Sequence, residues 1–184
     1  MRLLLCFFFL FAFSFFIVAQ TANNKKLEQI IDDSEHLSDT AQLRLFFEQK
    51  IKTLPNLQKE ILRRVHRIRI AQINAGIFER TDSQSVVLLR EANRNFPKDG
   101  DKGIQAWLQT QAGFYFYSFG QYDQALPYFV QARRIMDNFP KDKSHLSLIG
   151  ETYMRNAFFA GTINDDAMVV NYLETALEYT PETV

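Results

Sequence analysis

Cysteine is almost missing from this 184-residue sequence, which has a single one, Cys6. Such a chain builds no disulfide framework, and it offers no cluster of thiolates to a metal ion. Glycine and proline are also scarce, with 7 and 5 residues. Because all-β chains depend on many turn residues, this scarcity favours a helical fold.

Neither sign of charge is in excess, since 21 lysines and arginines balance 21 aspartates and glutamates. Proteins that bind nucleic acid normally show a basic excess, so the balance argues against a nucleic-acid partner. Apolar residues make up 47% of the chain. That fraction is enough for the core of one compact domain or a short repeat array.

The N-terminus carries the one long apolar run, from Leu3 to Ala19, after Arg2 and before polar residues that begin at Gln20. This pattern is typical of a secretory signal peptide, which we predict over residues 1–19. The alternative is a retained membrane anchor, because the run is at the lower limit of spanning length. Both alternatives predict export to the periplasm or cell envelope and confine membrane contact to this segment.

Four of the five prolines are evenly spaced, at separations of 42, 43 and 41 residues: Pro55, Pro97, Pro140 and Pro181. A fixed period of this size indicates a helical-repeat array. The ring of proline excludes helical geometry at the preceding residue, so each of the four is predicted to close a helix. The peptide Asn-Phe-Pro-Lys-Asp supports the repeat, because it occurs at 95–99 and again, unchanged, at 138–142.

Apolar residues between the prolines recur at helical spacing, and each unit divides into two helices. We predict an all-α domain over residues 20–184, with units at about 24–56, 57–98, 101–141 and 143–182. Capping residues, Ser38 or Asp39 and Thr81–Ser83, mark two of the helix starts. The eight expected helices are Lys26–His36, Ala41–Leu54, Leu57–Phe78, a helix from the Thr81–Ser83 cap to Phe96, Gly103–Phe119, Tyr122–Asn138, Leu146–Ala160 and Asp166–Tyr179.

The third unit carries small and aromatic residues in a characteristic order: Gly113, Phe116, Gly120, Tyr122, Ala125, Phe129 and Ala132. This order resembles a tetratricopeptide repeat (TPR). The resemblance implies that the small residues lie where helices approach closely, and that Phe116, Tyr122 and Phe129 fill the space between them. Gln109 and Ala112 depart from the tryptophan and leucine that the family prefers, and the period exceeds the usual 34 residues.

The resemblance also implies a right-handed solenoid of antiparallel helical hairpins whose first helices line a concave groove. The phenylalanine-rich leader and the Ala19-Gln20 junction resemble those of secreted Bacteroidetes proteins.

Two sets of residues are candidates for binding a ligand in that groove. Arg63, Arg67, Ile70 and Asn74 share one helix face, and arginine forks match the carboxylates of an acidic peptide. The alternative is a solvated face that pairs with Glu60 and its neighbours.

The second set is aromatic. By family geometry Trp107, Phe114 and Tyr117 face the groove, where aromatic residues are typical binding anchors. The alternative for these residues is packing in the core.

Residues of the types that serve in catalysis or metal binding are dispersed along the sequence. His36, His66 and His145 fall in different predicted hairpins, without a ligand partner at metal spacing along one helix. The sequence has no glycine-rich phosphate loop and no serine elbow. We therefore predict no catalytic, cofactor or metal site.

These patterns predict a non-enzymatic scaffold of the cell envelope that binds a protein or peptide in a concave helical-repeat groove. One alternative is the N-terminal sensory part of a larger membrane-bound signalling or transcription regulator. The other is an uncharacterised all-helical enzyme.

Overall fold

The computed structural model describes residues 25–77, 81–138 and 146–179, and these residues form helices and short turns without a strand. The prediction of an all-α fold is confirmed. A first helix covers residues 25–35 and is called the 25–35 helix below. The others are α2 (Thr40–Lys52), α3 (Asn56–Ile77), α4 (Ser83–Asn93), α5 (Lys102–Ser118), α6 (Tyr122–Asp137), α7 (Leu146–Thr162) and α8 (Asp166–Glu178).

Aspartate side chains begin four of these helices. Asp39 accepts from the backbone N–H groups of Ala41 and Gln42, at 2.7 and 2.8 Å. Asp82, Asp101 and Asp165 make the same kind of bond at the starts of α4, α5 and α8. A carboxylate suits this position because the first amides of a helix have no partner within the helix. These caps explain why the predicted helix starts lie close to the observed ones.

The prolines at 55 and 97 both follow helix ends, as predicted. The helix α4 ends three residues before the predicted Phe96, because Arg94 is extended and Asn95 has a positive φ of 49°. Pro140, Pro181 and most of the second Asn-Phe-Pro-Lys-Asp peptide lie outside the described residues.

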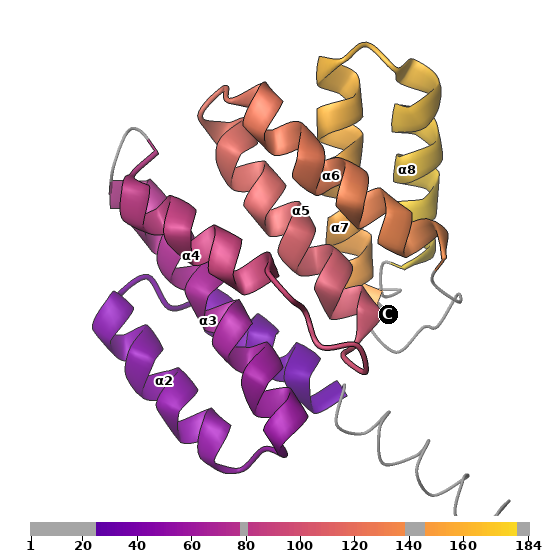
Figure 1. The fold of residues 1–184 in the computed structure, drawn as a ribbon. Helices are drawn as coiled ribbons and strands as arrows, with labels where there is room; N and C mark the ends of the chain where they lie inside the picture. Colours follow the sequence, from indigo (N-terminus) through magenta and orange to yellow (C-terminus); the bar gives the residue numbers. More distant parts are fainter. Residues whose placement is uncertain (1–24, 78–80, 139–145, 180–184) are drawn as a thin grey trace, which may run out of the picture.

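Consecutive helices pack as antiparallel hairpins, α3 with α4, α5 with α6 and α7 with α8 (Figure 1). The helices α5 and α6 approach most closely at Gly113, where a Cβ atom would lie 3.1 Å from the Phe129 ring. Ala125 and Ala132 are fully buried at this contact. The predicted role of the small residues is thus confirmed.

The core position that the resemblance implies for Tyr122 is wrong. Phe116 and Phe129 are buried, but Tyr122 is 47% exposed. Tyr122 is the first residue of α6, directly after the turn at Gly120, and its ring tilts over Tyr117 at 5.7 Å. It therefore covers the turn between the helices and does not fill the space between them.

The 25–35 helix joins the two ends of the described fold. Leu27 and Ile31 are fully buried in a core that also includes Trp107 and Leu148. The Ser147 hydroxyl at the start of α7 donates to the Glu28 carboxylate at 2.9 Å. The first helix therefore contacts the fourth hairpin of the chain, which consists of α7 and α8. In a linear repeat array, by contrast, each unit contacts only its neighbours.

No helix within the described ranges is both long and apolar enough to cross a membrane.

Candidate functional site

The predicted arginine face of α3 borders α4. The Arg67 Nε atom lies 3.3 Å from the Glu91 carboxylate, and Asn74 donates to the Ser85 hydroxyl at 3.4 Å. Ile70 packs partly buried against the core, and Arg63 is exposed. Since Glu91 and Ser85 both belong to α4, Arg67 and Asn74 join the two helices of one hairpin.

Arg64, within the same cluster of arginines, is buried beneath the end of α4. Its Nη1 atom donates to the carbonyl oxygens of Ala92 and Arg94, at 3.0 and 2.7 Å. Its Nη2 atom donates to the carbonyl of Asn95 at 3.0 Å and to Glu60 at 2.8 Å. The last carbonyls of a helix lack partners and carry the negative end of its dipole, so a guanidinium there stabilises the helix end.

Trp107 is not a surface residue, contrary to its predicted place in a groove. Its side chain is 1% exposed, because α7 packs against α5 and covers it. The indole N–H donates to the Glu151 carboxylate of α7 at 2.6 Å. Trp107 thus anchors one hairpin to the next.

Phe114 and Tyr117 come together with residues of α7. Their rings stack at 5.6 Å, and the Arg155 guanidinium lies 4.0 Å from the centre of the Phe114 ring. Arg155 is fixed by two bonds to Glu151, at 2.7 and 2.8 Å. All three side chains of this group, Phe114, Tyr117 and Arg155, are half-buried. We call them the aromatic–arginine patch.

Sequence reasoning missed Arg155. The available signal was the pair Glu151 and Arg155, spaced four residues apart in a helix with no other charged residue. Such a pair stabilises a helix, and in α7 it also reaches Trp107 and Phe114 on α5.

The end of the 25–35 helix lies on α3 near this patch. The Arg69 Nη2 atom donates to the carbonyls of Ser34 and Glu35, both at 3.1 Å. Burial and the neighbouring Glu151 raise the pKa of Glu35, which Arg69 and Arg155 oppose. Gln72 of α3 donates to Gln111 of α5 at 2.7 Å beside it. These bonds link the first helix to α3, and α3 in turn to α5.

The 25–35 helix also makes an acidic contact with the start of α7. The Ser147 hydroxyl reaches both Glu28, at 2.9 Å, and Asp32, at 3.4 Å. Burial raises the pKa of Asp32 from its ordinary value of 3.8 to about 6, and the nearby carboxylates of Glu28 and Glu35 contribute. An ionised Asp32 therefore weakens the fold at neutral pH.

We expect Asp32→Asn to be more stable than the parent at about pH 7.5, as measured by denaturant unfolding. The raised pKa means that folded Asp32 binds its proton more tightly than unfolded Asp32. The parent therefore gains stability as the pH falls from about 6 towards 4, and the advantage of the variant disappears over that range.

The matched control is Asp33→Asn, one residue further along the helix. Asp33 pairs with Lys50 of α2 at 3.7 Å, and both side chains are largely exposed. We expect this variant to lose less than about 1 kcal/mol of unfolding free energy. A stability difference between Asp32→Asn and the parent that stays constant from about pH 4 to 7.5 would contradict the assignment.

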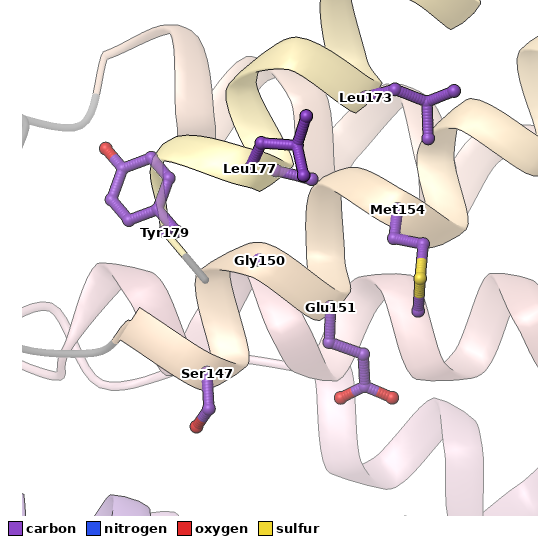
Figure 2. A pocket seen from close by; sticks show the side chains of 8 residues that line it. Ser147, Gly150, Glu151, Met154, Leu173, Leu177 and Tyr179 are labelled. Carbon is purple, nitrogen blue, oxygen red and sulfur yellow. The ribbon is translucent and has the colours of Figure 1, made fainter. Parts of the chain in front are cut away.

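A separate groove lies on the outer side of α7 and α8 (Figure 2). Its volume is about 470 Å³ and its wall is almost entirely apolar. We call it the end groove, and its lining residues are Ser147, Gly150, Glu151, Met154, Leu173, Ala176, Leu177 and Tyr179.

Within residues 25–77, 81–138 and 146–179, no three histidine, cysteine, aspartate or glutamate side chains form a metal-binding group. His66 stacks on Phe47 of α2 at 4.9 Å, and burial lowers its pKa.

The fold and these surfaces define an all-helical protein of packed antiparallel hairpins. No family model, curated protein or solved structure matches the chain.

Proposed function

We propose that this chain is a non-enzymatic scaffold of the cell envelope that binds a protein or peptide at the aromatic–arginine patch. The observation that supports this proposal is the half-buried stack of Phe114 and Tyr117, with the Arg155 guanidinium over the Phe114 ring. The 25–35 helix is docked nearby on α3. Aromatic and arginine side chains are the residues that most often anchor interfaces. The proposal keeps Phe114 and Tyr117 of the predicted site, leaves out Arg67 and Trp107, and adds Arg155 of α7.

The proposal includes a divergent TPR architecture and export by the signal peptide at residues 1–19. The close approach at Gly113 and the buried Ala125, Phe129 and Ala132 support the TPR assignment. The segment 1–19 lies outside the described residues, and its composition alone supports export.

Site-specific photocrosslinking tests the proposed surface. A benzoylphenylalanine residue replaces Tyr117 in one variant and Leu45, an exposed residue of α2, in the control. Irradiation of intact cells, followed by fractionation of the envelope, is expected to give a discrete adduct from position 117 and none from position 45. Equal adducts from both positions, or none from 117, would refute the proposal.

A further inference from the structure

The third hairpin (α5 and α6) and the fourth hairpin (α7 and α8) have helices that start at the same spacing along the sequence. The first helices start at Lys102 and Leu146, and the second helices at Tyr122 and Asp166, so both steps are 44 residues. Residues 44 apart therefore hold equivalent positions in the two hairpins. The same register applies to the end groove, whose equivalent in the third hairpin lies between α5 and α6.

In the third hairpin that equivalent groove is filled. The position of Met154 corresponds to Thr110, which is fully buried, and that of Leu173 corresponds to Phe129, which is 3% exposed. Met154 and Leu173 themselves are each 42% exposed. The fourth hairpin thus leaves an apolar surface open, whereas the equivalent surface of the third hairpin is covered.

The helix α7 covers the groove of the third hairpin. Phe159 stacks on Phe129 at 4.5 Å, and Asn156 donates to the Thr110 hydroxyl at 3.2 Å. A helix is therefore the shape that this kind of groove accepts. The end groove occupies the equivalent position on α7 and α8, and its wall is almost entirely apolar.

The end groove is also more apolar at its rim. Leu177 is 73% exposed, and its equivalent in the third hairpin is Arg133, a charged residue suited to water. An exposed leucine beside Leu173 and Met154 enlarges the apolar patch. Patches of this kind mark interaction sites when polar residues surround them.

The charges around the end groove are mainly acidic. The helix α8 carries Asp166, Glu174 and Glu178 and no lysine or arginine. Glu151 lines the groove, and Glu28 and Asp32 contact Ser147 at its edge. The complementary partner therefore has basic residues beside an apolar stripe.

A second copy of the chain is a poor occupant. A symmetric dimer would place the same groove against itself, and two concave surfaces do not fill each other. The exposed apolar side chains here are few, while a stable dimer buries about 800 Å² on each partner.

We propose that the end groove of α7 and α8 is a docking site for a basic amphipathic helix of a partner protein. The helix lies across Met154, Leu173 and Leu177 as α7 lies across α5 and α6. Its lysines or arginines face the exposed glutamates of α8. Glu151 lines this groove and also holds Arg155 of the aromatic–arginine patch, but the test below probes Leu177 and does not depend on the function proposed for the patch.

The probe is a synthetic peptide with the sequence of residues 146–162, because α7 is the helix that fills the equivalent groove. The basic peptide carries Met154→Lys and Phe158→Lys, at positions exposed in α7, and the acidic peptide carries glutamate at both. Fluorescence anisotropy with the full chain is expected to show saturable binding of the basic peptide. The acidic peptide should bind at least about tenfold more weakly, which corresponds to 1.4 kcal/mol.

Leu177→Lys should weaken binding of the basic peptide by at least about tenfold, because it removes an apolar contact and repels the lysines of the peptide. Leu45→Lys is the matched control, because Leu45 is also an exposed leucine, at 60%, but lies on α2. We expect the control to bind like the parent, and both variants to keep the helical circular dichroism of the parent. Absence of saturable binding, equal binding of the two peptides, or binding by Leu177→Lys equal to that of the parent would overturn the proposal. So would a dimer in solution that Leu177→Lys dissociates, because the occupant would then be a second copy.

Discussion

Trp107→Ala is expected to lower the free energy of unfolding by about 3–5 kcal/mol, the largest effect of any substitution considered. The indole is 1% exposed and belongs to the core that joins the 25–35 helix to α5 and α7. Its removal leaves a cavity at this junction and takes the N–H donor from Glu151. Urea denaturation followed by circular dichroism gives the change.

Two further variants separate the contributions of Trp107. Trp107→Phe keeps most of the apolar volume but removes the hydrogen bond to the charged Glu151 carboxylate, so we expect a loss of about 1–3 kcal/mol. Tyr122→Ala removes an aromatic ring that is 47% exposed, and a loss below about 1 kcal/mol is expected. If Trp107→Ala proved as mild as Tyr122→Ala, the buried position of the indole would be wrong.

Arg64→Ala is expected to cost about 3 kcal/mol of unfolding free energy, because it removes a charged donor from buried carbonyl groups. Three carbonyls at the end of α4 accept from this one guanidinium, those of Ala92, Arg94 and Asn95. Arg64→Lys should recover only part of the loss, since an ammonium cannot reproduce the planar fork.

The control for Arg64 is its neighbour. Arg63→Ala removes the same side chain from an exposed position, and we expect a change within about 0.5 kcal/mol. Hydrogen exchange adds a local measurement, because the amides in the last turn of α4 should exchange faster in Arg64→Ala and at the parental rate in Arg63→Ala. Equal effects of the two alanines on unfolding would contradict the capping role.

The helices and their starts were predictable from local signals. Apolar spacing, the aspartate caps and the glycine at 120 act within a few residues, so the sequence order reveals them directly. The close approach at Gly113 was also predictable, because a small residue in a helix signals a near neighbour. These features depend on short-range geometry.

The site was less predictable, because helical spacing identifies a face without saying which helix covers it. Trp107 and Phe114 share α5, yet α7 buries the first and leaves the second half-exposed. The arginine face of α3 proved to border α4 for the same reason. The contact between Glu28 and Ser147 joins residues 119 positions apart, a distance over which a single sequence gives no pairing signal.

That contact between the first helix and α7 determines how the domain comes apart. A linear array of hairpins can fray from either end, one unit at a time, since each unit depends only on its neighbours. Here the first helix shares one core with α7 and is tied to it through Ser147, so neither can detach without exposing the other's apolar side chains. We therefore expect the first helix and α7 to unfold together. The contact also slows folding, because distant parts of the chain must meet before it forms.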